Sequence, residues 1–279
     1  MYVDWIGAMT SKDWPVVGPA GGRYFEMTPC GYIANIWDET PIQEEWRPLV
    51  DDAVVSVTQC LGGDLDSIYL RGSVAEGRAR FATSDLDLVV ISRSPTHPSF
   101  SWPTEELHRR HPFTREVSIE TCALGDLRTD PRLSYMRVVL KVQCRLLHGI
   151  DRRYEMKRAR PGWEMVFAAH TLEDRHARFV ALRETGSDRI TLDRRTQSFF
   201  RAALRSGFEL YEDEIGRFTR DIDLCAQVLA VAQPSEADLF HCICRRTLQP
   251  AQRDDVEVAA RYMEWFLPTR KQRLVEEVE

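Results

Sequence analysis

The sequence lacks a long uninterrupted hydrophobic run, although hydrophobic residues make up 43% of its 279 residues. A helix that spans a membrane needs about 20 consecutive apolar residues, so we do not expect one here. The first residues, Met1 to Trp5, have neither the basic start nor the apolar stretch of a secretory signal. We therefore expect a cytoplasmic protein without a membrane partner.

A disulfide framework is also missing from the sequence. The seven cysteines are an odd number and are scattered without regular spacing, which is typical of reduced thiols. Only Cys242 and Cys244 lie close together, next to His241, and no further ligands stand at the spacing that a structural zinc site requires. We interpret these cysteines as ordinary helix thiols.

Positive charge is in the minority. The chain has 43 Asp and Glu against 37 Lys and Arg, which gives a formal net charge of −6. Proteins that coat nucleic acid rely on positive surface to release counterions from phosphates, so the acidity argues against that class. A small nucleotide, or a single docked RNA end, is not excluded.

The length and the hydrophobic pattern predict two domains after an irregular arm. Residues 1–40 are rich in Gly, Pro and aromatic residues and have no clear periodicity. Residues 41–152 predict an α/β domain with a mixed sheet, with helices at 41–61, 105–110 and 132–147 and strands at 67–71, 86–91 and 117–124. Residues 155–279 predict an all-helical C-terminal domain, with amphipathic stretches at 198–212, 217–231 and 256–266.

One arrangement indicates chemistry: a Gly-Ser pair follows the first predicted strand, and an Asp-x-Asp opens the next. Residues two apart in a strand face the same side, so Asp85 and Asp87 present two carboxylates together while Leu86 faces the core. Adjacent carboxylates repel each other unless a cation lies between them. Mg²⁺ suits them because it takes hard oxygen ligands and keeps room for phosphates. Gly72 and Ser73, at the start of a helix, offer a backbone N–H and a hydroxyl to a phosphate.

Residues 70–77 (Leu-Arg-Gly-Ser-Val-Ala-Glu-Gly) and 84–90 (Ser-Asp-Leu-Asp-Leu-Val-Val) carry this pattern. It resembles the signature of the DNA polymerase β-like nucleotidyltransferase superfamily, and in particular its small bacterial and aminoglycoside adenylyltransferase-like members. The resemblance covers residues 65–151 well and residues 198–250 loosely. It implies a Mg²⁺-dependent enzyme that transfers a nucleotidyl group, with ATP as the favoured donor, to an acceptor hydroxyl. It also implies that the helical domain forms the second wall of the nucleotide cleft.

The resemblance further implies a third carboxylate on a later strand, and two glutamates compete for this role. Glu116 and Glu120 are four residues apart, so both face the same side of the predicted strand and the spacing does not choose between them. Glu120 fits the apolar-acidic run of the family better, whereas the sequence from Glu116 to Ile119 resembles the streptomycin adenylyltransferases. We favour Glu120, with Glu116 as the alternative. The predicted catalytic and metal-binding residues are thus Asp85, Asp87 and Glu120, and the predicted nucleotide-binding residues are Gly72, Ser73 and Ser84.

Three hypotheses about function remain open at this point. A small cationic acceptor, such as an aminoglycoside, is favoured and predicts an acidic wall in the helical domain. The candidates for this wall are Glu209, Glu212, Asp213 and Glu214. An RNA end or a partner protein, as in toxin–antitoxin systems, predicts a local basic stripe instead. A nucleotide-binding module without turnover is the third. Basic residues on predicted helices are candidates to reach a triphosphate: Lys141, Arg145, Arg201, Arg205 and Arg220.

Overall fold

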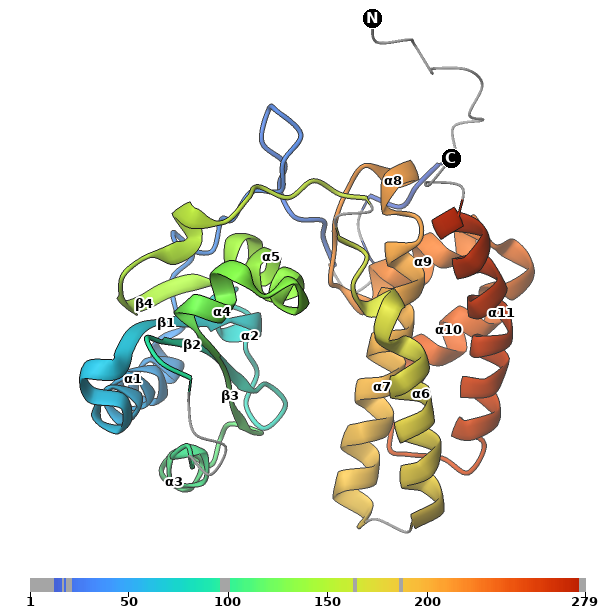
Figure 1. Cartoon of the computed structure of the whole chain (residues 1–279). Coiled ribbons are helices and arrows are strands. Elements are labelled where there is room, and N and C mark those ends of the chain that lie inside the picture. The colour runs from blue at the N-terminus through green and yellow to red at the C-terminus, as the bar shows by residue number, and fades with distance from the viewer. Residues whose placement is uncertain are drawn as a thin grey trace, which may run out of the picture. The chain divides into compact units, whose positions relative to one another are not determined.

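The computed structural model describes residues 13–16, 18, 22–95, 101–162, 165–185 and 188–275. The chain forms two compact units (Figure 1). Residues Glu26–Arg160 form a unit built on a sheet, and the described residues before Glu26 join those from Pro161 onward in a helical unit. None of the described helices has the length and apolarity that crossing a bilayer demands.

The first unit contains a four-stranded sheet in the order β3-β2-β1-β4. Its strands are β1 (Leu65–Arg71), β2 (Leu86–Ser92), β3 (Val117–Ala123) and β4 (Arg145–Gly149). Its helices are α1 (Arg47–Leu61), α2 (Gly72–Ala75), α3 (Thr104–Arg110), α4 (Leu124–Thr129) and α5 (Ser134–Gln143), with short 3₁₀ turns at Glu44–Trp46, Gly62–Asp64, Pro131–Leu133 and Arg152–Glu155. Strand β1 runs antiparallel to β2 and β4, whereas β2 and β3 are parallel. The expected mixed sheet with helices is therefore confirmed.

Both faces of this sheet are covered, and the alternation of side chains along each strand explains how. In β2, Leu86, Leu88 and Val90 belong to one buried cluster, which also contains Leu49 and Val57 of α1. Val89 and Ile91 belong to a second cluster on the opposite face, together with Val139 and Leu140 of α5. Figure 1 shows α1 and α5 on opposite sides of the strands. Successive residues along a strand face opposite sides, so Asp87, two residues before Val89, faces the α5 side, and Asp85 directly precedes the strand.

The segment predicted as a helix over 132–147 differs from the structure. Helix α5 ends at Gln143, because Cys144 adopts an extended conformation with φ −112° and ψ 144°. Strand β4 follows and pairs with the edge of β1, with Leu146 opposite Tyr69 and His148 opposite Ile68. The predicted helix is therefore wrong from residue 144 onward. Pairing with a distant strand outweighs the local helical pattern in such a short segment.

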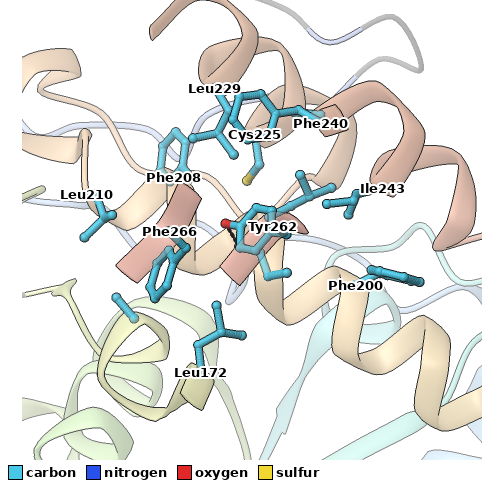
Figure 2. Packing of buried hydrophobic residues seen from close by; sticks show 14 of the residues in the cluster. Leu172, Phe200, Phe208, Leu210, Cys225, Leu229, Phe240, Ile243, Tyr262 and Phe266 are labelled. Atoms are coloured by element: carbon cyan, nitrogen blue, oxygen red, sulfur yellow. Dashed lines mark hydrogen bonds between the residues drawn. The ribbon is translucent and has the colours of Figure 1, made fainter. Parts of the chain in front are cut away.

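The second unit is built from helices. These are α6 (Ala168–Thr185), α7 (Arg189–Glu209), α8 (Glu212–Ile215), α9 (Ile222–Ala232), α10 (Ala237–Arg246) and α11 (Asp255–Val275), with a 3₁₀ turn at Pro234–Glu236. Tyr262 lies in the middle of its core, surrounded by Phe208, Leu229 and Phe240 (Figure 2). Its hydroxyl donates to the carbonyl of Ala203 at 2.5 Å. The expected helical C-terminal part is confirmed.

Candidate active site

The two predicted aspartates lie at the start of β2, where the apolar run of that strand begins. Asp87 stands opposite Arg71 in the antiparallel pairing of β1 with β2. Gly72 follows Arg71 with a φ of +74°, in the left-handed region that favours glycine. A Cβ at this position would lie 2.7 Å from Oδ2 of Asp87. Position 72 therefore requires glycine both for its backbone conformation and for the close approach of the Asp87 carboxylate.

The pairing of β2 with β3 fixes where the two glutamates lie. Asp87 stands opposite Ser118, and Val89 stands opposite Glu120. The carbonyl of Glu116 accepts a hydrogen bond from the N–H of Leu86 at 2.9 Å, so Glu116 is level with Asp85. Since a strand rises about 3.3 Å per residue, the Cα of Glu120 lies roughly 7 Å further along the strand than the position opposite Asp87. The register thus brings Glu116, rather than Glu120, next to the start of β2.

Two arginines accompany the acidic residues. The Nε of Arg115 donates to Oδ1 of Asp85 at 2.7 Å, and its terminal nitrogen contacts the second oxygen, which makes the pair bidentate. The hydrogen bond to Asp85 raises the pKa of Arg115; burial opposes this, and the charges of Asp85, Glu116 and Asp87 add to it. Arg71 forms an ion pair with Glu120 at 3.1 Å. Glu116 is exposed and has no ion pair among the described residues.

These residues make a hard-oxygen donor set that fits Mg²⁺ in its chemistry. The guanidinium of Arg115 already brings positive charge to both oxygens of Asp85, as a bound cation would. The Asp87 carboxylate lies directly against Gly72, where a Cβ would be only 2.7 Å from Oδ2. Within the described ranges, no three His, Cys, Asp or Glu residues are arranged as a metal site. Metal binding at Asp85 therefore requires the Arg115 pair to open.

The predicted nucleotide-binding residues lie on the turns that lead into and out of this region. Gly72 and Ser73 open α2, which is a single helical turn. An anion at this end would therefore be bound by the first backbone N–H groups of α2 and not by the dipole of a long helix. The Ser84 hydroxyl accepts from the N–H of Arg80 at 2.9 Å. The Ser84 carbonyl accepts from the N–H of Arg115 at 3.0 Å. Ser84 thus closes the loop before β2 and holds the backbone of Arg115.

The basic candidates have structural partners. Lys141 donates its Nζ to the carbonyl of Arg153 at 2.8 Å, and burial lowers its pKa. Arg145 donates to the carbonyl of Thr40 at 2.5 Å. In the helical unit, Arg205 donates twice to the carbonyl of Arg220, at 3.2 and 3.1 Å. Both Arg201 and Arg220 make further interactions.

The acidic wall predicted for the helical unit is wrong in its main residues. Glu212 is fully buried and Glu209 is only 9% exposed. Glu209 accepts from the N–H of Ala169 at 2.9 Å, and burial raises its pKa to about 8. Burial, with the charge of Glu209, also raises the pKa of Glu212. Glu214 pairs with Arg273. Of the four acids only Asp213 is exposed.

Sequence reasoning missed Arg115 and Arg71 as members of the site. Each stands directly beside a residue of the predicted motif, Arg115 before Glu116 and Arg71 before Gly72. That adjacency was a signal, because a group of carboxylates at a strand end needs positive charge to offset its repulsion. The actual partners, however, are distant in sequence: Arg115 binds Asp85 and Arg71 binds Glu120.

The fold is similar to that of a solved enzyme. The structure of the spectinomycin adenyltransferase AAD(9) from Enterococcus faecialis, determined with ATP and spectinomycin, superposes with a TM-score of 0.54. The match covers 81% of this chain and 99% of that chain, at 13% sequence identity. At this identity the likeness is one of fold. No protein-family model matches the chain, and no curated protein sequence matches it either.

Proposed function

We propose that this chain is a Mg²⁺-dependent nucleotidyltransferase that moves an adenylyl group from ATP to a hydroxyl of a small molecule. Two observations support this proposal most: a Cβ on Gly72 would lie 2.7 Å from Oδ2 of Asp87, and the charges of Asp85 and Asp87 both act on the guanidinium of Arg115 at the start of β2. The fold adds support, since the similar enzyme was solved with ATP and spectinomycin. The likeness in fold does not by itself establish the activity.

Asp85 and Asp87 would hold the metal, and Gly72 and Ser73 would bind phosphate oxygens. When bound, Mg²⁺ offsets the charge of the triphosphate and stabilises the entering and leaving oxygens of an in-line displacement. The backbone N–H groups of the first turn of α2 bind and orient the phosphate chain. Arg115, displaced from Asp85, remains close enough to supply positive charge to the same region.

We further propose Glu116 as the third carboxylate, in place of the favoured Glu120. Three observations support Glu116: it is level with Asp85, it is exposed, and its charge acts on the same arginine as those of Asp85 and Asp87. Glu120 is instead paired with Arg71. Glu116 would accept the proton of the acceptor hydroxyl or help to hold the metal. General base assistance of this kind is typically worth about 10²–10⁴-fold in rate.

The test is transfer of label from α-labelled ATP in the presence of Mg²⁺. Spectinomycin and a panel of aminoglycosides represent small acceptors, and tRNA and a cell lysate represent macromolecular ones. Asp87→Asn removes one proposed ligand, and Asp51→Asn, an exposed acid on α1 of the same unit, is the matched control. Label on a small molecule, lost only in the Asp87 variant, supports the proposal.

Other outcomes overturn part or all of it. Label on tRNA or on a protein would replace the small-molecule acceptor by a macromolecule. Label that is equally strong in the Asp87 variant would overturn the proposed site. Binding of ATP with Mg²⁺ but no label on any acceptor would indicate a nucleotide-binding module without turnover.

A further inference from the structure

A second site lies within the helical unit, in a pocket of about 440 Å³ between α6 and α7. Its lining comes from α6 (Arg175, Arg178, Phe179 and Leu182) and from α7 (Arg195, Ser198 and Phe199). A volume of this size falls within the range of ordinary small-ligand pockets. Arg195 and Arg205 are ten residues apart on the same helix, so they are separated by about 15 Å along its axis. The pocket is therefore distinct from the region of Arg205 and Arg220.

Three arginines surround this pocket without carboxylate partners. Nearby arginines of the same unit are paired: Arg189 with Asp193 at 3.2 Å, and Arg270 with Glu173 at 2.7 Å. Among the described residues, by contrast, no Asp or Glu lies within ion-pair distance of the three pocket arginines, Arg175, Arg178 and Arg195.

All three pocket arginines are exposed, and Arg175 has only a weak hydrogen bond, at 3.3 Å, to the hydroxyl of Thr171. Three like charges around one pocket repel each other. A bound anion would relieve this repulsion and accept charge-assisted hydrogen bonds from the guanidinium groups.

The floor of the pocket is apolar and rigid. The rings of Phe179 and Phe199 stack on each other with centroids 4.7 Å apart and an interplanar angle of 5°. Both rings are almost completely buried, and they form the apolar part of the lining together with Leu182. An inorganic anion would leave the half-buried Leu182 side chain in contact with water. A ligand that joins an anionic group to a flat apolar group would cover both parts.

We propose that this pocket binds a nucleotide, with its phosphate on the arginines and the Ser198 hydroxyl and its base against the Phe179–Leu182–Phe199 floor. The ligand is either a free nucleotide or one nucleotide of an RNA strand, since both present the same phosphate and base. No acidic residue lines the pocket, so binding there needs no metal ion. Nucleotide binding in this pocket thus differs from the metal-dependent binding proposed at Asp85 and Asp87. The inference goes beyond the proposed transfer reaction.

The test is calorimetric titration of the full chain in EDTA, which removes the metal on which the transfer site depends. The probes are ATP, inorganic pyrophosphate and a single-stranded RNA of about 12 nucleotides. The double variant Arg178→Gln with Arg195→Gln removes two of the three charges. Arg194→Gln is the matched control, because Arg194 is exposed on α7 but does not line the pocket. Thermal melting checks that each variant folds.

ATP or the RNA is expected to bind in EDTA, with affinity lowered at least about tenfold by the double variant and unchanged by Arg194→Gln. Tighter binding of ATP than of RNA identifies a free nucleotide, and the reverse identifies a strand; both support the proposal. Asp87→Asn should leave this binding intact, whatever it does to label transfer, so failure of either proposal is distinguishable. Absence of binding, indifference to the double variant, or pyrophosphate binding as tightly as ATP would each overturn it.

Discussion

Replacing Arg115 by Gln is expected to tighten the binding of a divalent metal at Asp85. Arg115 occupies both carboxylate oxygens of Asp85, so the metal must compete with it. Charge-assisted bidentate pairs are worth more than neutral hydrogen bonds, but both side chains are about a quarter exposed, and exposure reduces the value of an ion pair. We therefore take the pair as worth about 1–2 kcal/mol, which corresponds to about a 5- to 30-fold lower dissociation constant in the variant.

The assay is titration with Mn²⁺, followed by electron paramagnetic resonance in the absence of nucleotide. Arg115→Lys keeps the positive charge but loses the bidentate geometry, so it should fall between the wild type and Arg115→Gln. Arg128→Gln breaks the ion pair with Glu155 elsewhere in the same unit and should leave metal affinity unchanged. The reasoning is refuted if Arg115→Gln leaves metal affinity unchanged or weakens it. In that case Arg115 does not compete with the metal.

Three further predictions concern single side chains. Glu116→Gln should lower the single-turnover rate of label transfer by about 10²–10⁴-fold. Glu120→Gln should lower the same rate by less than about tenfold. A larger loss in the Glu120 variant would identify Glu120 as the third carboxylate. Gly72→Ala should lower the free energy of unfolding in urea by about 1–3 kcal/mol, since its φ is +74° and its Cβ would press on Asp87; an unchanged value would contradict the close approach. Burial raises the pKa of Glu209 to about 8, so its contribution to stability is fully present below about pH 4.5 and is lost as the pH rises to 8. Glu209→Gln should therefore stabilise the protein far more at pH 8 than at pH 5, by several kcal/mol in order of magnitude; equal effects at both pH values would exclude a buried neutral carboxyl.

Strands β1 and β2, and the positions of Gly72 and the Asp-x-Asp pair at their ends, were predictable because the sequence patterns that indicate them are local. Strands β1 and β2 each carry apolar residues on both faces, as a sheet covered on both sides requires. Gly72 marks where β1 ends, and the Asp-x-Asp pair marks where β2 begins. The shared face of Asp85 and Asp87 stays a prediction from the period of a strand, because β2 begins only at Leu86. These features do not depend on where a distant segment lies.

Features that depend on distant segments were not predictable in the same way. Leu146 and Leu147 continue an apolar pattern that suits a helix, and only pairing with β1 makes this segment a strand. Glu209 and Glu212 read as surface acids at a helix end. The structure buries both of them, with the N–H groups of Ala169 and Gly162 as hydrogen-bond donors. A sequence pattern gives no information about which neighbour removes such a side chain from water.

The choice between Glu116 and Glu120 also depends on a distant segment, because it is set by the pairing of β3 with β2. Periodicity assigns both glutamates to one face of the strand predicted from the sequence, but it says nothing about their positions along the strand axis, because residues four apart are equivalent by face. The position is set by hydrogen bonds between parallel strands, and the bond from Leu86 to the carbonyl of Glu116 makes that residue level with Asp85. Arg115, which precedes β3, binds the carboxylate of Asp85, and the charge of its neighbour Glu116 acts on the same guanidinium. Because the charges of Asp85, Asp87 and Glu116 all act on the guanidinium of Arg115, we expect variants of Glu116 and Arg115 to act on the same metal-dependent step.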